Sequence, residues 1–139
     1  MLPDPSESLS DHFLLAEYFI HLNAFDQQSW DYLKKQSSLY KQSVLGNLKR
    51  HADKLEIVRG LFNQPVHINS GYRCPAINKA VGGYANSYHM KGMAADIVVA
   101  DIPPATVQEI LRNWLGGMGT YQTFTHLDIR PYKARWTGP

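Results

Sequence analysis

The chain contains a single cysteine, Cys74, so no disulfide can form within it. The cysteine content therefore does not indicate whether the protein works in an oxidising or a reducing compartment. It has no run of about 18 apolar residues, so no stable membrane insertion is expected. The first residues, MLPDPSESLSDHF, include neither a basic segment nor an apolar one, and no secretion signal is predicted. No block of lysines and arginines accompanies the net charge of +2, so nucleic acid is not an expected partner.

What is present indicates one globular domain. A length of 139 residues is usual for a single domain, and 44% of the residues are hydrophobic, enough for a sizeable core. We expect one domain over residues 1–139, with a mainly helical part at 10–65 and a second part at 66–136. We also expect a monomer.

Helical periodicity dominates the first part of the chain. Ser10 and Ser29 are suitable N-caps for helices over about 12–22 and from Trp30 onward. The longest helical pattern runs from about 39 to 62, where apolar residues recur every three or four positions. This predicted apolar stripe consists of Leu45, Leu48, Ala52, Leu55, Val58 and Phe62.

The second part alternates short strands, turns and helices. Strands are predicted at 66–69, 93–99, 119–121 and 124–129, the last two as a hairpin. Helices are predicted at 75–80 and 105–115. We expect a loop at 84–91 and an irregular tail at 131–139. Helices mixed with short antiparallel strands indicate an α+β fold.

Two stretches carry residues that can bind a metal. His89 and Asp96 are seven positions apart, and Gly92 between them permits a tight turn. His126 and Asp128 lie two positions apart on a predicted strand, so their side chains share a face. Two histidines and a carboxylate with one open position are a known ligand set for catalytic zinc. By spacing alone, an ordinary loop histidine and a solvated carboxylate remain the commoner interpretation of the first stretch.

Three linked motifs resemble a known family. They are SGYRC-x3-N from residue 70, GG-x2-NS-x-H-x2-G-x-A-x-D from residue 82 and GG-x-G-x-Y-x2-F-x-H-x-D-x-R from residue 116. In this order they resemble the zinc-dependent D-alanyl-D-alanine carboxypeptidases and murein endopeptidases. That family shares its core with lysostaphin-type peptidases and the hedgehog signalling domain. The resemblance covers residues 66–136 and is greatest to single-domain phage and prophage members.

The resemblance implies a fold, an activity and a set of site residues. The fold would be a small antiparallel sheet that carries a zinc site and is surrounded by helices. The activity would be hydrolysis of peptide bonds in peptidoglycan stem peptides or cross-links, as a murein endopeptidase or carboxypeptidase. His89, Asp96 and His126 would bind Zn²⁺. Arg73 would bind a substrate carboxylate, and Ser87 would form a hydrogen bond near the metal.

The general base stays open. Several branches of the family have an acidic residue three positions before the last histidine ligand, where this chain has Thr123. Asp128 could act as the base or could orient a ligand, and Arg130 could pair with it. Tyr121 is a candidate for stabilising the oxyanion. No His–Cys arrangement supports a thiol mechanism through Cys74.

Two further expectations follow. Without a signal, the protein would be made in the cytoplasm and delivered to the cell wall by a holin or a virion, as a lysin. The alternative function is a zinc-stabilised cell-wall-binding module without activity, because the hedgehog domain keeps its metal without being a known peptidase. The remaining histidines are expected to be surface or hydrogen-bonded residues: His12, His21, His51 and His67.

Overall fold

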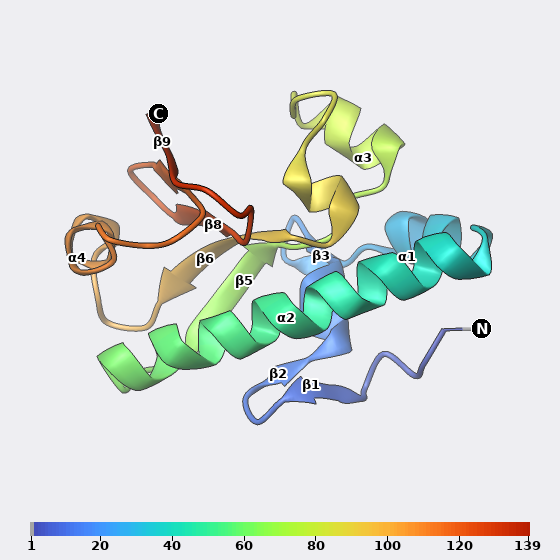
Figure 1. The fold of residues 1–139 in the computed structure, drawn as a ribbon, viewed down its shortest axis with the longest axis horizontal. Coiled ribbons are helices and arrows are strands. Elements are labelled where there is room, and N and C mark those ends of the chain that lie inside the picture. The colour runs from blue at the N-terminus through green and yellow to red at the C-terminus, as the bar shows by residue number, and fades with distance from the viewer. Residues whose placement is uncertain (1) are drawn as a thin grey trace.

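The computed structural model describes residues 2–139, which form helices packed on a small sheet (Figure 1). The elements before the long helix are β1 (Ser8–Ser10), β2 (Phe13–Leu14), the 3-10 helix η1 (Leu15–Phe19), β3 (Ile20–His21), β4 (Ala24–Phe25) and α1 (Gln27–Lys34). Then follow α2 (Ser38–Phe62), β5 (Val66–Ser70), α3 (Pro75–Ala80), the 3-10 helix η2 (Tyr88–Lys91) and β6 (Ala94–Val99). The last elements are α4 (Pro104–Ile110), β7 (Gly117–Thr120), β8 (Thr125–Asp128) and β9 (Ala134–Thr137).

The main sheet has five strands in the order β5-β6-β8-β7-β9. All neighbouring strands are antiparallel except β7 and β9, which are parallel. The predicted α+β fold is confirmed. The tail was expected to be irregular, and that prediction was wrong, because its residues form β9. This strand is held by pairing with the edge of β7, a contact that no local pattern in the tail encodes.

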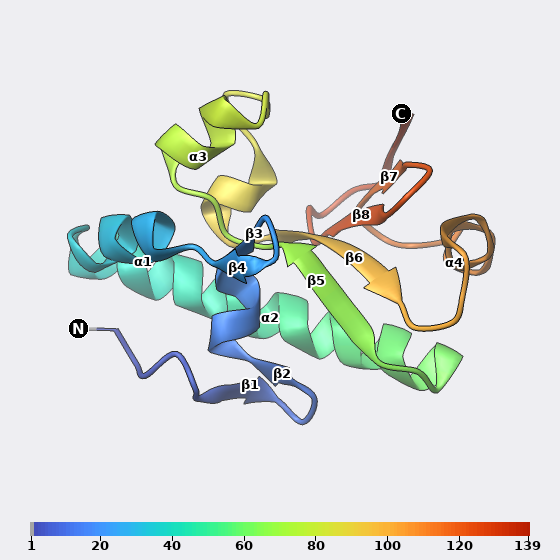
Figure 2. The ribbon, with the colours of Figure 1, turned by 180° about the vertical axis from the view of Figure 1, so that it is seen from behind.

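The long helix α2 lies across one face of the sheet (Figures 1 and 2). Its N-terminus is capped by Ser37, whose hydroxyl accepts a hydrogen bond from the Tyr40 backbone N–H at 3.2 Å. The predicted stripe is largely confirmed, although Leu45 and Phe62 are only partly buried. The buried residues of α2 are Val44, Leu48, His51, Ala52, Leu55 and Val58. Within residues 2–139, every helix is too short or too polar to cross a membrane.

His51 joins this helix to the sheet. Its Nε2–H donates to the carbonyl oxygen of Leu127 on β8 at 2.9 Å, and its Nδ1 accepts from the Tyr18 hydroxyl at 2.7 Å. The imidazole is fully buried, and burial lowers its pKa to about 4. The expectation of a hydrogen-bonded histidine is confirmed. The bond to Leu127 fixes the strand that carries His126 and Asp128.

The helix predicted over 12–22 is absent. Two short hairpins, β1–β2 and β3–β4, occupy this region with η1 between them. Phe13, Leu15, Tyr18 and Phe19 are all buried, which suits a segment wedged between other elements better than a helix with one apolar face. Tertiary packing therefore outweighed the weak local helical preference.

Two other helix ends differ from the predictions. Asp26, not Ser29, caps α1, because its carboxylate accepts a hydrogen bond from the Ser29 backbone N–H at 3.0 Å. Ser29 lies buried in the first turn, where its hydroxyl accepts from the backbone N–H of Cys74 at 3.0 Å. The helix predicted over 105–115 ends at Ile110, and turns lead from there to β7.

Candidate metal centre

One row of directly paired residues crosses the whole main sheet. Ser70 pairs with Asp96, Asp96 with His126, His126 with Gly119 and Gly119 with Trp136. Residues that pair directly project from the same face of a sheet. The register therefore brings Asp96 and His126 together, although they are 30 positions apart in the chain.

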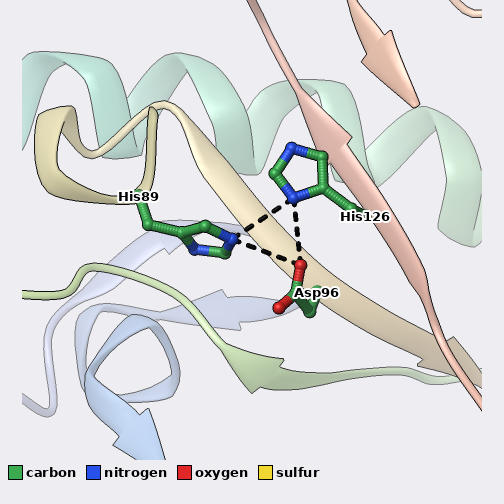
Figure 3. A group of neighbouring side chains, drawn as sticks. All are labelled: His89, Asp96 and His126. Atoms are coloured by element: carbon green, nitrogen blue, oxygen red, sulfur yellow. Dashed lines mark hydrogen bonds and ion pairs between the residues drawn. The ribbon is translucent and has the colours of Figure 1, made fainter. Parts of the chain in front are cut away.

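Three donor atoms converge above this row (Figure 3). His126 Nδ1 lies 3.0 Å from Asp96 Oδ1, and His89 Nε2 lies 3.2 Å from each of these two atoms. A tetrahedral zinc site has bonds of about 2.0–2.1 Å, which separates its donor atoms by about 3.3 Å. All three residues are buried. The donor set and its spacing therefore fit a zinc ion that keeps a fourth position open.

His89 lies in the 3-10 helix η2, inside the segment expected to be a loop. Its Nδ1–H donates to the carbonyl oxygen of Gly71 at 2.7 Å, which leaves the Nε2 lone pair facing the centre. Ser87 caps η2, and its hydroxyl accepts from the His89 backbone N–H at 3.2 Å. Gly92 ends η2 with a φ of 73°, and a Cβ there would lie 2.8 Å from the carbonyl oxygen of Val44.

His126 is oriented by the residue two positions after it. Its Nε2–H donates to Asp128 Oδ2 at 2.9 Å, so its Nδ1 faces the centre. Burial lowers the pKa of His126, but the hydrogen bonds to Asp128 and Asp96 outweigh burial and the net shift is upward. A histidine ligand whose second nitrogen bonds a carboxylate is typical of protein metal sites.

Asp128 is fully buried and held from several sides. Arg130 donates to it through Nε at 2.9 Å and through Nη2 at 2.7 Å, which confirms the predicted pairing. The backbone N–H of Gly117 donates at 2.8 Å, and a Cβ on Gly117 would collide with the carboxylate at 2.2 Å. Burial raises the pKa of Asp128, but the hydrogen bonds from His126 and Arg130 outweigh it and hold the pKa well below its usual range.

Arg73 contacts the candidate ligand Asp96 directly, whereas Arg130 contacts Asp128, the partner of His126. Arg73 Nη2 donates to Asp96 Oδ2 at 3.0 Å, and its Nε donates to the Ser70 hydroxyl at 3.0 Å. Its Nη1 lies 3.4 Å from the side-chain oxygen of Asn78. The guanidinium therefore forms a structural ion pair and also lines the hollow that contains the three candidate ligands.

Tyr121 lines the same hollow. Its ring is stacked on Phe124 with centroids 4.3 Å apart, and its hydroxyl accepts a hydrogen bond from Trp136 Nε1 at 3.0 Å. Thr123, in the turn before β8, is exposed. Cys74 is buried in the hydrophobic core and does not contribute to the centre.

Two residues of the site were missed by sequence reasoning. Asn78 contacts Arg73 and donates to the carbonyl oxygen of Tyr84 at 2.8 Å, and it occupies the last position of the SGYRC-x3-N motif, which could have identified it. The ring centroids of Trp136 and His126 are 4.9 Å apart. No spacing pattern in the tail indicated its role, because the role depends on the pairing of β9 with β7.

Comparisons with known proteins agree with this geometry. The family model described as peptidase M15 matches residues 26–128, a range that includes all three candidate ligands. The probable peptidoglycan L,D-endopeptidase MepK of Haemophilus influenzae is 33% identical over 145 residues, which cover 95% of this chain and 74% of that protein. The family resemblance of the three sequence motifs is thereby confirmed, and the chain belongs to the peptidase M15 family.

Proposed function

We propose that this protein is a zinc-dependent peptidase that cleaves peptide bonds of bacterial peptidoglycan, in stem peptides or in cross-links. The observation that carries the proposal is the triangle of donor atoms from His89, Asp96 and His126, with sides of 3.0 to 3.2 Å. The similarity to the Haemophilus influenzae relative, a probable peptidoglycan L,D-endopeptidase, supports peptidoglycan as the substrate.

The three ligands would hold the ion in a hollow of about 240 Å³, which they line together with Arg73 and Tyr121. When bound, zinc polarises a carbonyl oxygen and lowers the pKa of a water molecule to about 7. Arg73 would bind a carboxylate of the substrate through N–H groups that its protein partners do not take, since a planar guanidinium suits a carboxylate.

In this proposal Asp128 orients His126 and does not accept the proton of the attacking water. Its side chain has no exposed surface, and both oxygens already accept hydrogen bonds from His126, Arg130 and the Gly117 backbone. A carboxylate so placed fixes the ring orientation of a ligand and raises its basicity.

Tyr121 would stabilise the oxyanion. Because its hydroxyl oxygen accepts the indole N–H of Trp136, its own proton is free to point into the hollow. A hydroxyl that donates to the carbonyl oxygen as negative charge develops lowers the barrier to hydrolysis.

The test uses purified zinc-loaded protein on purified sacculi, with mass analysis of the released fragments. New amino and carboxyl termini are expected from the wild type, and none from His126→Ala, which would also lose the metal. His67→Ala, a change of an exposed histidine on β5, is the matched control and is expected to behave as the wild type. Binding to sacculi without new termini would instead support a cell-wall-binding module.

A further inference from the structure

Two hollows meet at the candidate metal centre. The first, which we call the Arg73 hollow, measures about 240 Å³ and contains the three candidate ligands with Arg73 and Tyr121. The second, the Arg130 hollow, measures about 330 Å³. It has three lining residues that the first lacks: Asn86, Tyr88 and Arg130. The hollows adjoin, because both are lined by Tyr84, Ser87, His126 and Trp136.

Arg130 lines its hollow and has N–H groups that are not used by its bonds to Asp128. A guanidinium has five N–H groups, and the bonds to Asp128 use Nε–H and one hydrogen of Nη2. Aromatic rings fix the plane of the group, with the Tyr88 centroid 4.3 Å and the Trp136 centroid 5.2 Å from the guanidinium carbon. The side chain lines the hollow and is 16% exposed, so part of it is accessible to a ligand.

The charge of the Arg130 hollow suits an anion. Among its lining residues within the described chain, Arg130 is charged and none is acidic. Asp128, the ion-pair partner of Arg130, is not among the lining residues, and its carboxylate also accepts hydrogen bonds from His126 and the Gly117 backbone. A carboxylate that entered the hollow would therefore find a preoriented two-pronged donor.

We propose that the Arg130 hollow is a second substrate subsite, which binds a carboxylate on the side of the scissile bond opposite to the Arg73 hollow. This inference rests on the proposed function. The substrate class is a peptide that carries an acidic group on each side of the cleaved bond, as two cross-linked stem peptides do.

Tyr84, which lines both hollows, offers a contact for an extended ligand. Tyr84 is 84% exposed, and its carbonyl oxygen is held by Asn78, which also contacts Arg73. An exposed aromatic ring on an anchored backbone offers a stacking surface for a chain that crosses from one hollow to the other. The two arginines, one in each hollow, would then each bind one arm of a cross-linked peptide.

The experiment uses four synthetic cross-linked stem-peptide dimers: the free acid, the dimer amidated on either arm, and the dimer amidated on both. Hydrolysis by the zinc-loaded wild type, Arg130→Lys and Arg73→Lys is followed by chromatography. In the wild type, amidation of either arm is expected to lower kcat/KM about tenfold, which corresponds to about 1.4 kcal/mol. Arg130→Lys should abolish the discrimination against amidation of one arm, and Arg73→Lys that against the other arm.

The ratio between two dimers on the same variant isolates carboxylate recognition, because any loss of metal or displacement of Asp128 affects both dimers alike. Equal rates for all four dimers on the wild type, or unchanged ratios in Arg130→Lys, would overturn the subsite and leave the proposed function intact. If no dimer is hydrolysed, calorimetry with the same zinc-loaded protein decides. If the wild type binds the free acid more tightly than the amidated dimers and Arg130→Lys does not, the subsite is supported although the proposed function is not. If all dimers bind equally, both the subsite and the proposed function are overturned.

Discussion

Gly119 on β7 lies directly opposite Trp136 on β9, and a methyl group at Gly119 would lie 2.5 Å from the indole nitrogen. The space left by the absent side chain lets the indole extend over the strand to Tyr121 and lie beside His126. A residue without a side chain thus brings the last strand into contact with the candidate metal centre.

Gly119→Ala is therefore expected to displace Trp136 and to break its hydrogen bond to Tyr121. Overpacking of a filled site costs about 1–3 kcal/mol in the free energy of unfolding. Denaturant unfolding followed by circular dichroism measures this cost. Gly46→Ala on α2 is the matched control, because a Cβ there has no neighbour within 4 Å. That variant should be unchanged or more stable by up to about 1 kcal/mol, and an equal loss in both variants would contradict the prediction.

Trp136→Phe and Tyr121→Phe should lower kcat with little effect on KM. Each change removes one link of the chain that directs the Tyr121 proton into the Arg73 hollow. The loss of one oxyanion donor is expected to reduce kcat about 100- to 1,000-fold for Tyr121→Phe. Trp136→Phe keeps an aromatic ring and should lose less. Steady-state kinetics on a soluble muropeptide measures both. If the double variant lost the full product of the two single effects, the residues would act independently and not through their hydrogen bond.

Asp128→Asn should weaken zinc binding about 10- to 100-fold, because the amide no longer supplies a charged partner for the His126 imidazole. Competition with a chromophoric chelator measures the affinity. Asp53→Asn, a change on the exposed surface of α2, is the control and should keep the wild-type affinity. If Asp128→Asn bound zinc with the wild-type affinity, Asp128 would have no role in metal binding.

His51 should make the metal-free protein less stable in mild acid. Its pKa is lowered from the ordinary histidine value of 6.5 to about 4 in the folded protein, because burial disfavours the charged form. The unfolded chain therefore binds a proton first as the pH falls below about 6.5, and stability is lost down to about pH 4. Between pH 7 and pH 4.5 the loss from this residue is about 2 kcal/mol.

Chemical denaturation of the wild type and His51→Gln in the presence of a chelator tests this expectation. Glutamine can form hydrogen bonds to Tyr18 and Leu127 but does not titrate, so the variant should lose about 2 kcal/mol less than the wild type over the same interval. Parallel curves for the two proteins would show that another group carries the acid sensitivity.

Some of the fold could be predicted because its signals are local. The buried stripe of α2 recurs every three or four residues, and the proline-led start of α3 and the alternation in β5 are equally short-range. The hairpins of 8–25 carry no such period. Their buried aromatic residues are placed by contacts with α1, α2 and β5, so a pattern of neighbours along the chain indicated the wrong element.

The sequence by itself determined which residue types the candidate centre can use. His89, Asp96 and His126 stand in recognisable motifs, and the i, i+2 spacing already put Asp128 on the face of His126. Tertiary structure alone decided that Asp128 is buried against Arg130 and that Trp136 reaches the centre. The physical reason is that burial and cross-strand register arise from pairing between remote segments, here β8 with β6 and β9 with β7, and a linear pattern does not encode that pairing.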